Sequence, residues 1–283
     1  MRSWNVGREG SVQKTEVFAG RRNHWQTFGH LYLGLIFIFT YLPVVLVVVY
    51  SFNTGRFGVW HGFTTDWYVR LFNNRSLHAN LQNSLIVAFT SVALAIGIGT
   101  AGAVGLARSH FKGKQLVESL AIAPLLLPEI ILGMAYLTLF SGIGIRFGYG
   151  TMIVAHMTFC IPYIFLNVQS RLAGLDPHLV EAARDLGASS GRAFRDITLP
   201  LIAPAIFSGA LLAFAMSMDD VVITFFVAGV GTDTLPLRIY SLTRIGITPE
   251  IYALCTLMLV VIVFCILGYM GVDRVRRLRA LRH

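Results

Sequence analysis

Residues 84–107 read SLIVAFTSVALAIGIGTAGAVGLA and contain no charged side chain. A helix needs about 20 apolar residues to cross a hydrocarbon core of roughly 30 Å, and this stretch is long enough. Small residues recur at every fourth position in two adjacent rows, one formed by Ala93, Gly97, Ala101 and Gly105 and the other by Ala95, Gly99, Ala103 and Ala107. The stretch therefore predicts a membrane helix with a face that another helix can approach closely.

Other apolar stretches flank this one on both sides. Together they are Leu31–Tyr50, Ser84–Ala107, Leu120–Phe140, Thr151–Val168, Leu199–Ala228 and Ile251–Gly271. Lipid cannot satisfy free backbone groups, and these runs are too long and too uniformly apolar for barrel strands. Composition agrees, since 55% of the residues are hydrophobic and 13% are charged. We predict an all-α integral membrane protein with six transmembrane helices.

Lys and Arg residues are divided unevenly among the connecting segments. If the N-terminus is cytoplasmic, 17 of the 23 fall on the inside, in segments 1–30, 108–117, 171–198 and 272–283, and 6 fall outside. Because basic residues favour cytoplasmic loops, we expect both termini in the cytoplasm, and the net charge of +9 does not indicate a nucleic-acid partner. The expected organisation is a tail at 1–30, one transmembrane domain at 31–271 and a basic tail at 272–283.

Three carboxyl groups fall inside the predicted spans. Pro124 and Pro128 remove backbone donors and predict a helix break just before Glu129. Asp219 and Asp220 lie roughly 30 Å along a helix from the start of their span, toward its periplasmic end. Ionisable groups at membrane depth usually face a cavity or a partner, so all three are candidate pathway residues. Two alternatives stay open: Glu129 caps N–H groups freed at the break, or one aspartate pairs with a base or caps a helix.

The segment between the fourth and fifth spans reads DPHLVEAARDLGASSGRAFRDITLP over residues 176–200. Asp176 suits a helix N-cap, Pro177 the first helical position and Gly187 the residue after the helix. Ser189 or Ser190 suits the cap of a second short helix. We therefore expect this loop to be structured.

Within that segment, residues 181–200 resemble the EAA loop of ABC importer permeases. The family pattern is Glu-Ala-Ala, three residues, Gly, nine residues, Ile, one residue and Leu-Pro, matched by Glu181, Ala182, Ala183, Gly187, Ile197, Leu199 and Pro200. The resemblance implies a type I, MetI-like permease whose coupling helix docks on a cytoplasmic ATP-hydrolysing subunit. The sequence contains no G-x-x-x-x-G-K-[ST] phosphate loop, so ATP hydrolysis is expected on a partner chain.

Further segments resemble the spermidine/putrescine-type permeases. They are SFNTGRFGVWHGFTTDWYVRLFNN at 51–74, NSLIVA at 83–88, PLLLPEIILG at 124–133 and MDDVVITFF at 218–226. This resemblance covers nearly the whole chain and implies import of putrescine or spermidine. For such polycations Glu129, Asp219 and Asp220 would form a suitable lining, because carboxylates offset lost hydration. Another small solute, such as an opine, an aminophosphonate or a different organic cation, stays open within the same family.

The implied assembly is an importer in the bacterial inner membrane. It combines this chain with a second homologous permease, two cytoplasmic ATP-binding subunits and a periplasmic solute-binding protein, with ATP and Mg²⁺ on the ATPase and no cofactor here. We expect no catalytic residue and no metal site, and we interpret His156 as a helix–helix hydrogen-bonding group. An ion-coupled secondary transporter would explain the buried acids but leaves the EAA pattern unexplained. An intramembrane enzyme lacks any supporting motif.

Overall fold

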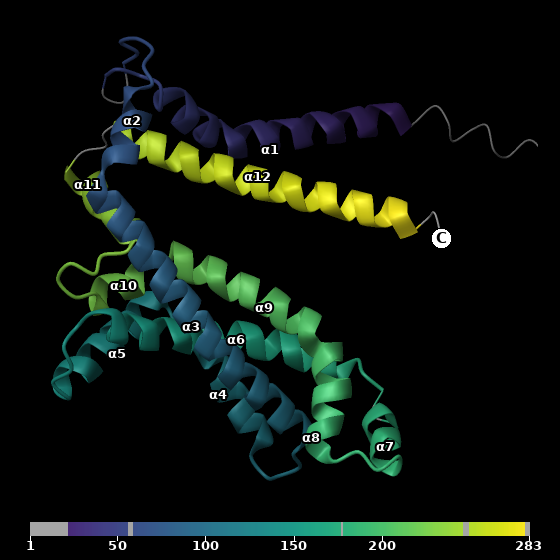
Figure 1. Ribbon diagram of the computed structural model, residues 1–283. Helices are drawn as coiled ribbons and strands as arrows, with labels where there is room; N and C mark the ends of the chain where they lie inside the picture. The colour runs from purple at the N-terminus through teal and green to yellow at the C-terminus, as the bar shows by residue number, and fades with distance from the viewer. Residues whose placement is uncertain (1–21, 56–58, 177, 246–248, 281–283) are drawn as a thin grey trace, which may run out of the picture. The chain divides into compact units, whose positions relative to one another are not determined.

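The computed structural model describes residues 22–55, 59–176, 178–245 and 249–280 (Figure 1). Every regular element in these residues is helical, apart from one isolated antiparallel bridge between Asn53 and Phe63. The predicted all-α class is therefore confirmed. The chain forms two compact units, one of residues 72–247 and one that joins residues 1–71 to 248–283.

Helices make up most of the described chain. They are α1 Arg22–Tyr50, α2 Asp66–Asn73, α3 Arg75–Arg108, α4 Lys114–Leu126, α5 Glu129–Gly142, α6 Tyr149–Ala173, α7 His178–Asp185, α8 Ser190–Ala193, α9 Leu199–Asp219, α10 Val222–Val227, α11 Leu235–Ile245 and α12 Pro249–Ala280, with a π-helical turn η1 at Phe194–Thr198 between α8 and α9.

Membrane-spanning length is reached by four helices of the described residues. They are Phe28–Tyr50 within α1, α3, α6 and the continuous run Ser190–Asp219. A fifth span results if α4 and α5 are taken together, and this pair is bent by 103°. The apolar part of α12 in the described residues, Pro249–Phe264, is shorter. Length and composition thus give a multi-pass membrane protein with four or five spans in the described chain.

Two breaks interrupt the predicted spans. The third stretch breaks between α4 and α5, just before Glu129, as Pro124 and Pro128 predicted. The fifth stretch differs from the single helix expected over Leu199–Ala228, because α9 ends at Asp219 and Asp220 has extended backbone angles (φ −65°, ψ 128°) before α10 begins. Hydrophobicity alone did not reveal this second break, because the surrounding residues are apolar on both sides.

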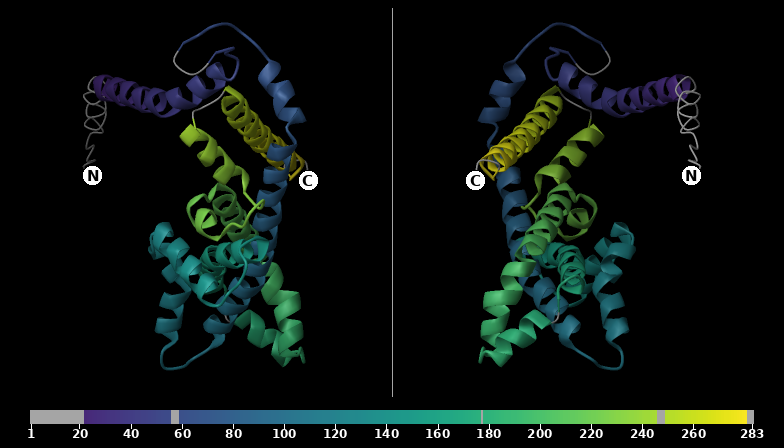
Figure 2. Two further views of the ribbon diagram at one scale, coloured as in Figure 1. Left: turned by 90° about the vertical axis from the view of Figure 1, so that its left-hand side faces the viewer. Right: turned by 90° about the vertical axis from the view of Figure 1, so that its right-hand side faces the viewer.

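The core of the 72–247 unit lies along α6, which packs against α3 and α9 (Figure 2). Glycines permit these approaches: a Cβ placed on Gly99 of α3 would lie 3.1 Å from the Ile161 carbonyl oxygen, and one on Gly209 of α9 would lie 2.9 Å from Ile164 Cα. The row containing Gly99 is therefore the packed one. A Cβ on Gly97 of the other row would meet nothing within 4 Å.

In the other unit, α1 and α12 pack together, and the rings of Tyr50 and Tyr252 lie 6.3 Å apart. The buried Asn53 organises the segment that follows α1. Its amide donates to the Val59 carbonyl at 2.8 Å and accepts from the His61 N–H at 2.9 Å. These bonds satisfy backbone groups of a connection that has almost no regular structure of its own.

Candidate functional site

The N-terminal half of the candidate coupling loop folds as the sequence predicted. The His178 N–H donates to the Asp176 carboxylate at 2.9 Å, so Asp176 supplies the side-chain cap expected at the start of α7. Pro177, predicted for the first helical position, lies outside the described residues. Glu181 of α7 is exposed and contacts the His178 ring, with 3.1 Å between Oε2 and Nδ1. The glutamate of the EAA pattern therefore stands on the free surface of this short helix.

Gly187 ends α7 in the left-handed conformation, with φ +86°. The Ala188 N–H donates to the Ala183 carbonyl at 3.0 Å, and the Gly187 N–H donates to the Arg184 carbonyl at 2.9 Å. This pair of bonds is the Schellman motif, which requires a residue that tolerates positive φ after the helix. The predicted role of Gly187 as the helix-ending residue is confirmed.

An apolar stripe runs along the exposed side of α7 and just past its end. It consists of Leu179, Ala182 and Leu186, which are three and four residues apart and share one helix face. Leu186 is 89% exposed, an unusual position for a large apolar side chain unless a partner covers it. Beside this stripe is an open hollow of about 490 Å³ lined by Glu181, Arg184, Asp185, Gly187, Ala188 and Ser189.

The remaining positions of the EAA pattern lie elsewhere. Ser189 caps α8, accepting from the Arg192 N–H at 3.4 Å, and α8 continues through η1 into α9 without a gap. Ile197 is half-buried in η1, whereas Leu199 and Pro200 are exposed at the start of α9. Here Asp196 accepts a hydrogen bond from Arg195 at 2.9 Å. The pattern thus joins a surface helix to the beginning of a membrane helix.

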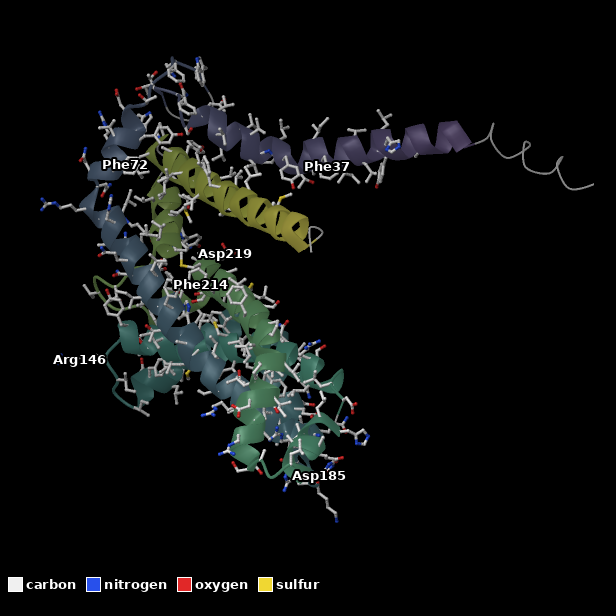
Figure 3. All side chains as sticks on the ribbon, turned by 45° about the vertical axis from the view of Figure 1, so that its right-hand side comes forward. Phe37, Phe72, Arg146, Asp185, Phe214 and Asp219 are labelled. Carbon is white, nitrogen blue, oxygen red and sulfur yellow. The ribbon has the colours of Figure 1, made fainter. Side chains whose placement is uncertain are left out.

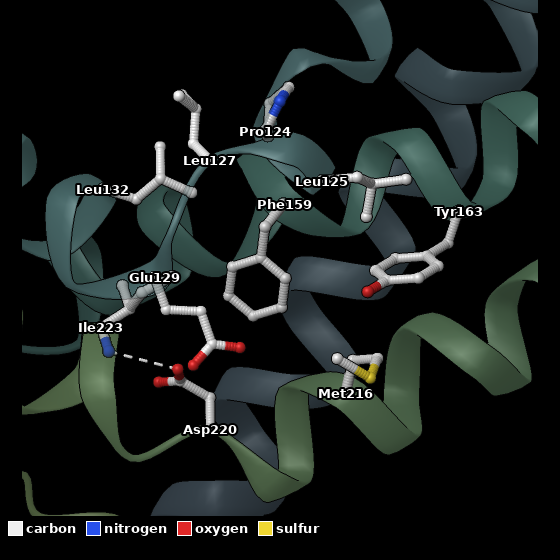
Figure 4. Close-up of a pocket in the computed structure, with 10 residues that line it drawn as sticks. All are labelled: Pro124, Leu125, Leu127, Glu129, Leu132, Phe159, Tyr163, Met216, Asp220 and Ile223. Atoms are coloured by element: carbon white, nitrogen blue, oxygen red, sulfur yellow. Dashed lines mark hydrogen bonds between the residues drawn. The ribbon is translucent and has the colours of Figure 1, made fainter.

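Two of the three predicted pathway acids meet at one pocket (Figure 4). Glu129 is the first residue of α5 and Asp220 precedes α10, and these two helices pack together because Gly133 of α5 leaves room for the Phe226 ring. The carboxylates of Glu129 and Asp220 point toward one another into a cavity of about 70 Å³. Phe159 and Tyr163 of α6 are also among its lining residues.

Asp220 is buried and fully engaged by protein groups. Its oxygens accept from the Ile223 N–H at 3.2 Å, the Thr224 N–H at 2.8 Å and the Thr224 hydroxyl at 2.7 Å. His156 Nε2 lies 3.4 Å from the same carboxylate. The alternative that one aspartate caps a helix and pairs with a base is therefore confirmed for Asp220, and its bonds stabilise the first turn of α10.

His156 joins α6 to both sides of the break after α9. Its Nδ1 lies 2.8 Å from the Ser217 hydroxyl and its Nε2 lies 3.0 Å from the Thr224 hydroxyl. Because Thr224 gives its proton to Asp220, Nε2 acts as the donor toward Thr224. The interpretation of His156 as a helix–helix hydrogen-bonding group is confirmed. Sequence reasoning missed Ser217 and Thr224, since isolated hydroxyl residues in an apolar helix carry no distinctive signal.

Glu129 and Asp219 differ from Asp220 in their surroundings. Both are exposed in the isolated chain, and within the described residues neither carboxylate makes a hydrogen bond or ion pair. Glu129 does not cap the start of α5, where the N–H groups of Ile131 and Leu132 donate to the Pro128 carbonyl instead. That alternative for Glu129 is wrong. Asp219 lies at the end of α9, far from Asp185 in the candidate coupling loop (Figure 3).

The 72–247 unit combines membrane-length helices, a capped surface loop and a pocket with two carboxylates, an arrangement that suits a transport subunit. Residues 93–277 match the family described as binding-protein-dependent transport system inner membrane component, and the chain belongs to this family. The family consists of transport subunits rather than enzymes, which confirms that expectation for the present chain.

The relatives make the comparison more specific. The chain is 43% identical over 230 residues to the spermidine/putrescine transport system permease protein PotC of Haemophilus influenzae, covering 81% of this chain and 90% of the relative. It is 41% identical over 235 residues to the putrescine transport system permease protein PotI of Escherichia coli K12, covering 80% and 84%. Among solved structures, a chain of a bacterial ABC transporter that imports the acidic polysaccharide alginate matches with a TM-score of 0.69 at 13% identity, covering 89% and 96%. At this identity the last match supports the fold alone.

Proposed function

We propose that this chain is a permease subunit of an ABC importer that carries a polyamine, putrescine or spermidine, through the bacterial inner membrane. The observation that supports this most strongly is the identity above 40% to two permeases named for these substrates, over most of both chains. In the proposed complex a second homologous permease completes the pathway, and a periplasmic binding protein delivers the solute. Two cytoplasmic subunits bind ATP and Mg²⁺.

The pocket acids agree with a cationic substrate. A polyamine that leaves water for a low-dielectric passage loses hydration, and fixed carboxylates offset part of that loss. Glu129 and Asp219 have no protein partner within the described residues, so they are free to face a substrate or the second permease. Asp220 contributes a fixed negative charge at the same pocket. Phe159 and Tyr163 add aromatic surface, which attracts ammonium groups.

The candidate coupling loop agrees with ATP-driven transport. The stripe of Leu179, Ala182 and Leu186 is a small apolar surface with charged groups beside it, as expected for a helix that docks in a groove. We assign this stripe to the ATP-binding partner, with Glu181 and the hollow around Gly187 at its rim. In this arrangement the loop faces the cytoplasm, the chain crosses the membrane six times, and both termini are cytoplasmic.

The direct test is uptake of radiolabelled putrescine and spermidine by proteoliposomes that hold the purified complex and its binding protein. We expect uptake of at least one of them that needs ATP and stops without the binding protein. Binding-protein-stimulated ATP hydrolysis without polyamine uptake would retain the importer and overturn the substrate. Uptake that persists without the ATP-binding subunits would favour an ion-coupled transporter and overturn the proposal.

The coupling assignment has a separate test at Gly187. Gly187→Val places a β-branched residue at φ +86°, where it is strained, while a Cβ at this position meets nothing within 4 Å. We expect uptake to be lost while the periplasmic protein still binds its solute, and Glu181→Ala should act in the same direction. The matched control is Gly191→Ala, a helical glycine of α8 with equally open surroundings. Normal uptake by both Gly187→Val and Glu181→Ala would contradict the assignment.

A further inference from the structure

Arginine side chains from two other helices donate hydrogen bonds to the start of α9. Arg108, the last residue of α3, donates from Nη2 to the Thr198 hydroxyl at 3.0 Å. Arg171, in the last turn of α6, donates from Nε to the Leu201 carbonyl at 3.0 Å. Thr198 is 3% exposed, so the first bond reaches a buried hydroxyl. We call these two contacts the arginine clasp.

The clasp lies where the backbone is irregular. Residues Phe194–Thr198 form a π-helical turn, and the Leu199 N–H donates to the Phe194 carbonyl, five residues back. Such a turn carries one residue more than α-helical geometry allows, and π turns within helices occur frequently at functional sites. Thr198 is its last residue, so the hydroxyl that Arg108 binds sits at the joint between the loop and α9.

On either side of this joint the protein is well packed. The backbones of α3, α6 and α9 approach closely at Gly99 and Gly209, as described above, but these contacts lie roughly three helical turns from the clasp. On the loop side, α7 packs against α8 and η1. A displacement of α7 is therefore passed to η1, and η1 continues along the chain directly into α9. Among the described residues, the clasp provides the only side-chain hydrogen bonds between residues 198–201 and the ends of α3 and α6.

We propose that Arg108 and Arg171 are positioning residues that transmit the movement of the coupling loop to α3 and α6 together with α9. The inference rests on the proposed function, since it assumes an ATP-driven partner that displaces α7. It goes beyond that function by assigning the transmission to two guanidinium groups outside residues 181–200. Neither arginine lies in the pocket with Glu129 and Asp220.

The test compares Thr198→Val with Thr198→Ser in the complete transporter with its binding protein. Valine has nearly the shape of threonine but no hydroxyl, whereas serine keeps the acceptor for Arg108. We expect Thr198→Val to lower the number of solute molecules imported per ATP hydrolysed by about tenfold, the factor that corresponds to 1.4 kcal/mol. Thr198→Ser should retain the wild-type ratio. Arg108 and Thr198 form one hydrogen bond, so the loss of either partner already breaks it. The double variant Arg108→Ala with Thr198→Val should therefore lower the import ratio no further than either single change.

Controls separate this inference from general damage. Thr138→Val removes a hydroxyl that bonds only the Met134 carbonyl of its own helix, at 2.9 Å, and should leave the ratio unchanged. If Thr198→Val does not assemble, Arg171→Met supplies the measurement, because methionine keeps an unbranched side chain but has no N–H to donate to the Leu201 carbonyl, and the side chain of Arg171 is exposed. A wild-type ratio in the assembled clasp variants, or additive losses in the double variant, overturns the clasp. Absence of ATP-dependent uptake in the wild-type complex overturns the proposed function instead.

Discussion

At the scale of single residues, Asp220 and Glu129 share a pocket but have opposite environments. Asp220 is buried, and backbone N–H groups, the Thr224 hydroxyl and His156 surround its carboxylate. Glu129 faces the same cavity with no hydrogen-bond partner in the described chain. A carboxylate that already has its full set of donors holds its surroundings in place, whereas an open one is available to a passing cation.

Variants of the two acids should therefore fail in different ways. We expect Glu129→Gln to raise the KM for polyamine uptake on the order of tenfold, since a charged hydrogen bond contributes about 1.5 kcal/mol or more. Its melting temperature in detergent should match the wild type. Asp220→Asn places an amide against the N–H groups of Ile223 and Thr224 and should lower the stability by about 1–3 kcal/mol. Thermal unfolding and uptake kinetics of both purified complexes check these two expectations. An unchanged KM for uptake by Glu129→Gln would contradict a role of Glu129 in the substrate pathway.

At the scale of helices, a π turn just before the fifth apolar stretch and an extended residue within it define the two ends of α9. Its first end is the π turn with the arginine clasp, and its second end is the extended residue Asp220. At the second end the Asp220 carboxylate accepts from the Ile223 and Thr224 N–H groups, so these donors are satisfied within the protein, as irregular structure at membrane depth requires. Between the two ends, Gly209 lets α9 approach α6 so closely that a Cβ there would lie 2.9 Å from the Ile164 Cα.

This close approach predicts a sharp difference between two glycine substitutions. Gly209→Ala must displace the backbone of α6, because the contacts at 2.9 Å and 3.1 Å are to Ile164 Cα and the Tyr163 carbonyl oxygen. We expect it to destabilise the protein by about 1–3 kcal/mol. Gly97→Ala meets nothing within 4 Å and should be neutral or slightly stabilising, since alanine favours helices. Thermal melting of the two variants provides the comparison, and equal melting temperatures would mean that α6 and α9 are not in contact at Gly209.

At the scale of the whole molecule, the proposed topology assigns two exposed loops to the two sides of the membrane. The loop at residues 176–198 carries exposed arginines, and the loop between α10 and α11 exposes Val230. Under the proposed topology these two loops lie on opposite sides of the bilayer. The coupling loop then faces the ATP-binding subunits, and the acids at the far end of α9 lie nearer the side from which the solute arrives.

Cysteine labelling tests this orientation at two fully exposed positions. In a background without Cys160, Cys255 and Cys265, we expect Val230→Cys to react with a membrane-impermeant maleimide added to spheroplasts. Leu186→Cys should react only in inside-out vesicles that contain this chain without the ATP-binding subunits, which are proposed to cover this position. Both side chains are almost completely exposed in the structure, so accessibility to the reagent rather than burial decides the result. The reverse pattern would invert the proposed topology.

The sequence by itself determined the all-α membrane class, the break at Pro128, the caps at Asp176 and Gly187, and the family through its EAA pattern. These features are local: apolar length, missing backbone donors and positive φ are properties of a few neighbouring residues. The tertiary structure decided the surroundings of Asp220, because His156 of α6 lies 3.4 Å from its carboxylate and contacts Ser217 and Thr224 on either side of it. It also decided which row of small residues packs on α6, and it placed Arg108 beside Thr198 across 90 residues of sequence. Such contacts depend on how distant helices are positioned, which no local pattern specifies.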